Sequence, residues 1–229
     1  MILVLARVGD ETGRPFVEEF PGASALFTCL DLADHPLSLS CPGFAASTLT
    51  VGGRRLAVGE IRGVVNLLPW IEPDTLISYD PEEREYQAAE CSALVAFFLD
   101  GLACRVVNRP TSLSLHGPVA NPVGWLHLAG AERIPLAPLR LRSDAMTESR
   151  TVEDEETIDV LCVGGSVVAP SGTAADAYTA QLAQRSGLDY IKAYYWHRDG
   201  RDVRFVHAET VPDVRDEIVR RELIRLLSP

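Results

Sequence analysis

Apolar residues in the first half of this chain fall into short continuous runs separated by turn residues. Residues 1–8 and 61–70 are two such runs, and their continuity favours strands that are buried on both faces. Between them, residues 26–56 contain shorter runs that prolines and the Gly52–Gly53 pair interrupt, which predicts small strands joined by tight turns. A phosphate loop at this Gly pair is not expected, because no helical pattern follows it.

Residues 80–101 carry the clearest helical pattern. Asp80 is a suitable N-cap, Pro81 suits the first helical position, Glu83 completes a pattern like a capping box, and Gly101 marks the end. The apolar positions of this segment lie on one stripe, which predicts a helix packed on the core; they are Leu94, Phe97, Phe98 and Leu102.

Three further helices and several strands are expected along the rest of the chain. The helices are predicted from Asn121 to Gly130, from Ala174 to Ser186, and from Asp213, as its cap, to Leu227. Strands are expected at 104–108 and 134–141, and a hairpin closed by a Gly–Gly pair at 160–170. The fold class predicted is therefore α/β (α+β), with an antiparallel sheet in the second part.

Residues 142–159 differ from their surroundings because acidic side chains crowd there with few apolar ones. Such a composition is typical of a solvated linker. We therefore expect domains at 1–141 and 160–229, joined by an acidic linker at 142–159.

The most informative stretch is 187–213, where two runs rich in aromatic and β-branched residues flank Asp199–Gly200. A two-residue turn at this dipeptide predicts a hairpin with a fixed register; its pairs are Trp196–Val203, Tyr194–Phe205, Lys192–His207 and Tyr190–Glu209. On this register Lys192, Tyr194, His207 and Glu209 share one face with the apolar Trp196, Val203 and Phe205. The polar groups form either a solvated sheet surface or the floor of a pocket, which makes these four the candidate catalytic and ligand-binding residues.

Composition and charge exclude some classes of partner. The chain of 229 residues is 47% hydrophobic and 23% charged, which is ordinary for a globular protein. A formal charge of −11 disfavours nucleic acid and anionic membranes as partners, and Lys192 is the only lysine. Five cysteines without zinc spacing, and an N-terminus without a signal-peptide pattern, lead us to expect a cytoplasmic protein with reduced thiols and no metal site.

Isolated polar residues add a second set of candidates. Asn66, Asn108 and Arg109 follow predicted strands on the side where open α/β sheets bind ligands, so they are candidate ligand-binding residues. The histidines at 35, 116 and 127 are isolated in the sequence and are expected at the surface or in caps.

The order of these segments resembles the RimK-like ATP-grasp ligases, especially those that modify ribosomal peptides. In the first half the resemblance rests on VVNLLP, a helix with Tyr86 and Glu90, VVNRP, a helix that begins at Pro122, and AERIPLAPL. In the second half it rests on VLCVGGSVVAP, AQLAQRSGLDYIKAYYW and DVRFVHAETVPD. The resemblance implies an N-terminal pre-ATP-grasp-like α/β domain, followed by a remnant of the ATP-grasp C-terminal subdomain. It also implies a homodimer, for which Phe97, Phe98 or Trp70 are possible interface residues.

The chain departs from this family where the family binds ATP. The segment with the phosphate-binding lysines is replaced by the short acidic stretch between Leu141 and Val160. Where the family carries an aspartate and an E-x-N motif for Mg²⁺, this chain has Tyr194, His207 and Glu209.

Two further family positions also differ. A pair of arginines is Leu67 and Leu68 here, and a lysine is Asn121. We therefore expect that binding of ATP and Mg²⁺ is lost, so that no cofactor is needed.

Three hypotheses on function follow from the resemblance and its departures. The favoured one is a non-catalytic accessory protein that binds a peptide, a small molecule or a partner protein such as an active ligase. The second is an enzyme in which His207 acts as base or metal ligand beside Glu209 and Lys192. The third is an ATP-dependent carboxylate–amine ligase that a partner chain completes. Whether the chain is an enzyme is left open, but an active ATP-dependent ligase is not expected.

Overall fold

The fold is described from a computed structural model, in which contacts divide the chain into two compact units. One unit is Met1–Ala120 with Thr210–Pro229, and the other is Asn121–Glu209. The residues described are 1–33, 38, 40, 43–111, 114–119, 121–138, 156–198 and 202–228. Most of the predicted acidic linker, the end of the predicted strand at 134–141, and the Asp199–Gly200 turn lie outside them.

The first unit is built on a parallel sheet with strand order β2-β1-β5-β6. Its strands are β1 (Ile2–Leu5), β2 (Ser24–Phe27), β5 (Gly63–Asn66) and β6 (Arg105–Val106). Every residue of β1 and β5 is buried, as the continuous apolar runs predicted. Because the strands are parallel, the carboxyl ends of all four lie along one edge, which is the side where Asn66, Asn108 and Arg109 were expected.

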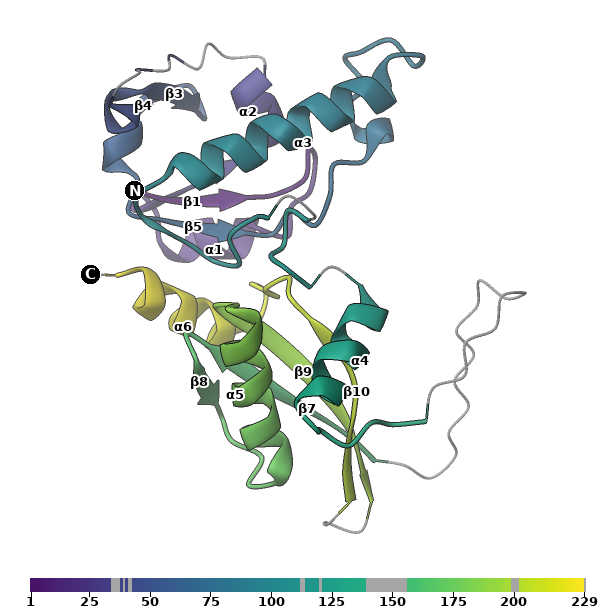
Figure 1. Cartoon of the computed structure of the whole chain (residues 1–229). Coiled ribbons are helices and arrows are strands. Elements are labelled where there is room, and N and C mark those ends of the chain that lie inside the picture. The colour runs from purple at the N-terminus through teal and green to yellow at the C-terminus, as the bar shows by residue number, and fades with distance from the viewer. Residues whose placement is uncertain are drawn as a thin grey trace. The chain divides into compact units, whose positions relative to one another are not determined.

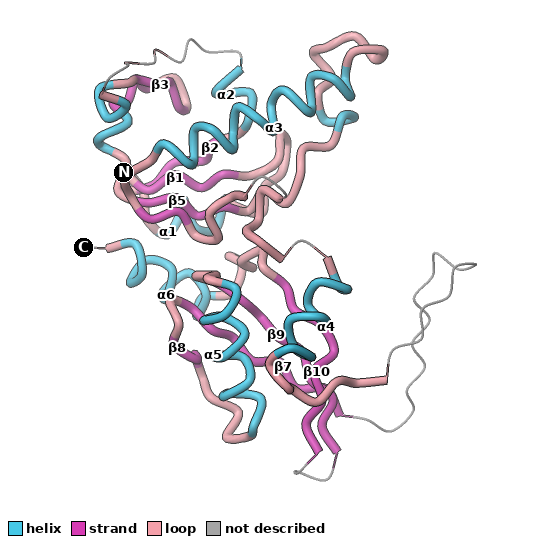
Figure 2. Tube along the Cα trace, in the orientation of Figure 1, coloured by secondary structure: helices cyan, strands magenta, loops and turns pink. Residues whose placement is uncertain are grey.

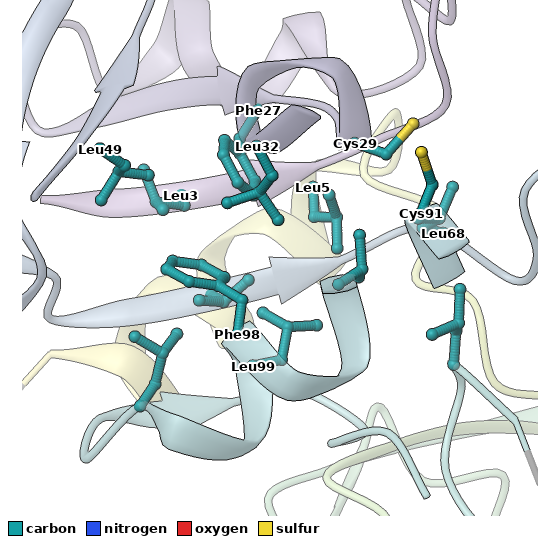
Figure 3. Packing of buried hydrophobic residues seen from close by; sticks show 14 of the residues in the cluster. Leu3, Leu5, Phe27, Cys29, Leu32, Leu49, Leu68, Cys91, Phe98 and Leu99 are labelled. Carbon is teal, nitrogen blue, oxygen red and sulfur yellow. The ribbon is translucent and has the colours of Figure 1, made fainter. Parts of the chain in front are cut away.

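Helices cover both faces of this sheet (Figure 1). Helices α1 (Arg14–Glu19) and α6 (Glu217–Leu227) lie on one face. Helix α6 packs closely on β5: a Cβ added to Gly63 would lie 2.8 Å from Cδ2 of Leu227. Helices α2 (Cys29–Ala33) and α3 (Arg84–Gly101) cover the other face. There Leu3 and Leu5 pack with Phe98 and Leu99 in one buried cluster (Figure 3).

Two predicted helices begin later than expected, for the same reason. The Asp80 and Asp213 carboxylates accept hydrogen bonds from the backbone N–H two residues further on, at 2.9 Å and 3.2 Å. This is the geometry of a turn closed by an aspartate, and each helix begins three residues later than predicted. Helix α6 instead uses Asp216 as its N-cap, with 2.8 Å from the Ile218 N–H to its Oδ1.

The remaining elements of the first unit are short. A hairpin of β3 (Thr48–Val51) and β4 (Arg54–Ala57) closes through the Gly52–Gly53 pair, at φ of 55° and 74°, as predicted. Short 3-10 helices span Phe44–Ala46, Val58–Glu60 and Pro73–Thr75. None of the described helices is both long enough and apolar enough to cross a membrane.

The second unit is an antiparallel sheet with strand order β10-β9-β7-β8, and two helices pack on it (Figure 2). The strands are β7 (Glu156–Val163), β8 (Ser166–Val168), β9 (Tyr190–Arg198) and β10 (Asp202–Glu209). The helices are α4 (Pro122–Ala131), capped by Asn121, and α5 (Ala174–Ser186), capped by Thr173 and ended by Gly187 at φ 68°. Glu132 joins the two helices, because its carboxylate accepts hydrogen bonds from Gln181 at 2.7 Å and Arg185 at 2.6 Å.

The unit boundaries differ from the domain boundaries that the composition suggested. Residues 156–159, which were assigned to the acidic linker, belong to strand β7, and residues 210–229 cluster with the first unit. Acidic side chains mislead here because a strand with one solvated face can carry them on that face, as β7 carries the exposed Asp159.

The hairpin forms, but its predicted register is wrong. Val203 pairs with His197 and Phe205 with Tyr195, one residue out of the predicted register. Phe205 and Tyr195 are thereby buried on the helix-covered face, away from Tyr194. A bulge between Phe205 and His207 then shifts the register again.

Candidate functional site

The face of the antiparallel sheet opposite its helices carries the four residues that the sequence singled out on the hairpin. Beyond the bulge, His207 pairs with Tyr194 and Glu209 with Lys192. Strand β7 adds Asp159, which pairs with Tyr194 from the other side. Because side chains alternate between faces, all five lie on one face, and we call them the hairpin cluster.

Aromatic stacking and two polar contacts hold the hairpin cluster together. The rings of Tyr194 and His207 stack with centroids 4.4 Å apart and planes 8° from parallel. The Tyr194 hydroxyl donates to Glu209 Oε2 at 2.9 Å. Lys192 Nζ lies 2.9 Å from Asp159 Oδ2 and 5.5 Å from the centre of the Tyr194 ring.

These contacts shift the pKa values of Lys192 and Tyr194. Partial burial alone lowers the pKa of Lys192, but the hydrogen bond and charge of Asp159, with the Tyr194 phenol, raise the pKa above its ordinary value. Burial, followed by the hydrogen bond to the Glu209 carboxylate, raises the pKa of Tyr194. Near neutral pH Lys192 is therefore a cation and Tyr194 a neutral phenol, so neither is prepared to exchange a proton with a substrate.

The donor set of the cluster does not fit Mg²⁺–ATP. Magnesium requires several oxygen ligands around one point, usually carboxylates and waters. Here the two carboxylates, Asp159 and Glu209, are turned to different partners within the cluster. In the part of the chain that the structure describes, no group of three or more His, Cys, Asp or Glu side chains is arranged to hold a metal ion.

The second set of candidates lies in the first unit, at the carboxyl edge of the parallel sheet. The Asn66 amide donates to the Leu115 carbonyl at 2.6 Å, and its oxygen accepts from the Leu68 N–H at 3.1 Å. Asn108, at φ 52°, donates to the Thr210 carbonyl at 2.6 Å. Both amides therefore fix loops at this edge, and a ligand-binding role for them stays a prediction.

Arg109 binds backbone carbonyls at the C-terminal end of helix α3. Its guanidinium donates to two carbonyls in the last turn of that helix, those of Leu99 and, at 3.3 Å, Asp100. It also donates to two carbonyls just beyond the helix, those of Leu102 at 3.1 Å and Cys104 at 2.8 Å. The contacts explain the position of Arg109 without a ligand, and its predicted role in binding stays untested.

Sequence reasoning missed His116, which was expected at the surface or in a cap. The side chain is only 3% exposed, and its Nδ1 is 3.5 Å from the hydroxyl of Thr210, the residue whose carbonyl Asn108 binds. Its Nε2 has no hydrogen-bond partner among the described residues. Burial lowers the pKa of His116 to about 4, although the Thr210 and Leu68 carbonyls oppose this effect. By contrast His127 is exposed, as expected, and His35 lies outside the described residues.

Comparisons of sequence give no relative. No protein-family model matches the chain, and no curated protein matches its sequence.

Comparison of structure identifies the fold. The macrocyclase MdnC from Microcystis aeruginosa MRC, bound with its precursor peptide MdnA, aligns with a TM-score of 0.70 and 11% identity over 99% of each chain. The ATP-grasp ligase PsnB, complexed with minimal precursor, Mg and ADP, aligns with a TM-score of 0.66 and 13% identity over 99% of this chain and 96% of PsnB. D-alanine–D-alanine ligase from Aeromonas hydrophila aligns with a TM-score of 0.56 and 14% identity over 100% of this chain and 94% of the ligase.

The chain therefore has the fold of ATP-grasp ligases, a mixed α/β fold with a parallel and an antiparallel sheet. This confirms the fold that the sequence resemblance implied. At 10–14% identity the likeness extends to the fold alone, and the predicted loss of the ATP-binding segment stays a prediction.

Proposed function

We propose that this chain is a non-catalytic ATP-grasp-like protein of the cytoplasm that binds a peptide or small molecule as an accessory in a biosynthetic pathway. It acts as a homodimer or beside a partner protein such as an active ligase. The hairpin cluster carries the proposal, because the positions that the resemblance assigns to Mg²⁺ ligands hold a stacked Tyr194–His207 pair and Glu209.

The chemistry of this face suits binding better than catalysis. Lys192 and Asp159 neutralise each other, and Glu209 is engaged by the Tyr194 hydroxyl. A ligand would therefore meet an aromatic surface with polar groups at its rim, which is a common composition of peptide-binding surfaces.

A peptide is the favoured ligand class because solved structures with this fold hold peptides. MdnC was solved with its precursor peptide MdnA, and PsnB with a minimal precursor. Those complexes support the choice of peptides as the first ligands to test on this chain.

Thermal unfolding with ATP and Mg²⁺ tests the loss of nucleotide binding. A ligand that binds only the folded state stabilises it by about 2.7 kcal/mol at a concentration of about 100 Kd, so a binder raises the melting temperature. We expect no change for this chain, while PsnB, which was solved with Mg and ADP, should be stabilised when measured alongside. A rise specific to ATP with Mg²⁺ would contradict the proposal and favour a ligase that a partner chain completes.

Peptide selection tests binding at the hairpin cluster. Peptides from a random displayed library are selected on the immobilised full chain, and the affinity of the best ones is then measured in solution. We expect Tyr194→Ala to weaken binding at least tenfold and Tyr194→Phe to weaken it less, because only alanine removes the stacked ring. His127→Ala, on the helix-covered side of the same sheet, is the control. Selected peptides that bind all variants equally would exclude the hairpin cluster as their site.

A further inference from the structure

The outward face of helix α3 presents aromatic side chains to solvent. The buried face of this helix is formed by Ala88, Cys91, Val95, Phe98 and Leu99. On the opposite side Tyr86 is 64% exposed and Phe97 is 55% exposed, with Ala89 and Ala93 exposed between them. We call these four residues the α3 outer stripe.

The spacing of the stripe matches a surface on which another helix packs. At about 3.6 residues per turn, Tyr86, Ala93 and Phe97 project within a narrow sector, so the aromatic rings lie at the two ends and small residues between them. The stripe is about 16 Å long, or about three turns, at a rise of about 1.5 Å per residue.

Phe97 is held in place although it is exposed. Its ring meets the edge of Phe44 at a centroid distance of 6.1 Å and an angle of 89°. Phe44 in turn packs on the buried Phe98 at 6.2 Å. A ring that is already ordered loses little conformational freedom when a partner covers it, which is a property of binding hot spots.

The segment that carries the stripe is strongly acidic. Residues 80–101 contain six carboxylates and one base, Arg84, whose guanidinium donates to the Tyr79 carbonyl at 3.3 Å. Two exposed carboxylates of the helix, Glu90 and Asp100, project about 40° to either side of Tyr86 and so flank the stripe. Two more, Glu82 and Glu83, are exposed in the turn that precedes α3. None of the four forms an ion pair with another described residue.

We propose that the α3 outer stripe docks a basic amphipathic helix of a partner protein, about three turns long. Apolar side chains of the partner cover Tyr86 and Phe97, and its Lys or Arg side chains face the four carboxylates. A second copy of this chain is disfavoured as occupant because it would bring two acidic faces together. The proposal is independent of the proposed function, since the stripe and the hairpin cluster lie in different units.

Two synthetic peptides test the proposal on the full chain. The first is a helix of 14 residues in design, with Leu on one face and Lys on the flanks, and the second replaces each Lys by Glu. Fluorescence anisotropy measures both at low and at high salt. We expect the basic peptide to bind at least tenfold more tightly than the acidic one, and to weaken at least tenfold as salt rises.

Variants locate the binding. Phe97→Ser and the charge reversal Glu90→Lys should each weaken the basic peptide at least tenfold, and Glu90→Lys should also reduce the salt dependence. Two variants are the controls: Glu18→Lys, at an exposed site on helix α1 across the sheet, and Ile77→Ser, at an apolar site that is 79% exposed. Because Glu90 is exposed and unpaired with described residues, its variant tests the surface even if Phe97→Ser impairs folding.

Three outcomes would overturn the proposal. One is equal affinity for both peptides, and another is an affinity that Glu90→Lys leaves unchanged. The third is sedimentation of the chain as a dimer that Phe97→Ser and Glu90→Lys both dissociate, which would make a second copy the occupant. Tyr194→Ala should bind the basic peptide normally, so failure here is distinguishable from failure of the proposed function.

Discussion

The buried His116 makes the stability of the first unit depend on pH in a defined direction. Its side chain is 3% exposed, and burial lowers its pKa from 6.5 to about 4 in the folded protein. In the unfolded chain the side chain is hydrated and its pKa returns to about 6.5. The positive charge of Arg7 is a further, smaller cause of the low folded pKa.

The sign of the effect follows from proton uptake. Above about pH 6.5 neither state binds a proton at His116, so the free energy of unfolding does not depend on this group. Between pH 6.5 and about 4 only the unfolded state binds the proton, so stability falls as pH falls. The loss is on the order of 3 kcal/mol by pH 4, since the folded and unfolded pKa values differ by about 2.5.

Urea unfolding at several pH values between 4.5 and 7.5 measures this loss. Because carboxylates also titrate in this range, the informative quantity is the difference in unfolding free energy between the natural chain and His116→Asn. We expect this difference to fall by about 1.4 kcal/mol per pH unit below pH 6. His127→Asn, at an exposed site, should follow the natural chain at every pH. Parallel curves for the natural chain and His116→Asn would refute the reasoning.

Three further predictions concern packing and termination in the first unit. Arg109→Ala should lower the unfolding free energy in urea by about 1.5–3 kcal/mol because the carbonyls at the end of α3 lose a charged donor, and a change below about 0.5 kcal/mol would contradict that role. Gly63→Ala should lower the free energy of unfolding by about 1–3 kcal/mol, because the new Cβ would lie 2.8 Å from the Leu227 side chain. The double variant with Leu227→Val should lose less unfolding free energy than the sum of the two single changes. Full additivity would contradict the contact. Burial raises the pKa of Cys29 to about 12, and its neighbour Cys91 is buried as well (Figure 3). Both thiols should therefore stay unlabelled by N-ethylmaleimide at pH 8 in the folded chain and become labelled in urea, as measured by peptide mass spectrometry. Fast labelling of the folded chain would exclude this packing.

The buried strands β1 and β5 could be predicted from the sequence because the signal for them lies in their own residues. A strand that is buried on both faces must be apolar at every position, and β1 and β5 are. The N-terminal ends of α3 and α6 could not be fixed to the residue, because Asp80 and Asp213 serve equally well as caps or as turn formers. Only packing of the helix on the sheet decides between the two.

The hairpin shows how a correct grouping can arise from a wrong register. The Asp199–Gly200 dipeptide favours a two-residue turn, but burial of Tyr195 together with Phe205 outweighs that local preference. This register is shifted by one residue from the predicted one, and without a further change it would place His207 on the buried face. The bulge after Phe205 shifts the register again and returns His207 to the face of Tyr194. A bulge leaves no periodic signal, so sequence patterns cannot place it.

Tertiary contacts also explain the roles that the sequence did not reveal. Asp159 was counted as part of a linker because its acidic neighbours hid the alternation of strand β7. Arg109 and His116 were assessed by their neighbours in sequence, whereas their partners are the end of α3 and the Thr210 loop. Residues whose partners are distant in the sequence are the ones for which pattern reasoning has no information.

The hairpin cluster and the α3 outer stripe differ in how their charges are balanced, and this difference predicts how each responds to salt. Within the cluster, Lys192 is paired with Asp159, so the surface has little net charge to steer a ligand. The carboxylates beside the stripe have no partner among the described residues, so their field extends into solvent and acts on a charged ligand before contact. Binding at the cluster should therefore depend weakly on ionic strength, and binding at the stripe strongly. A chain with both ligands bound would show two salt dependences, and measuring them separately would assign each ligand to its unit.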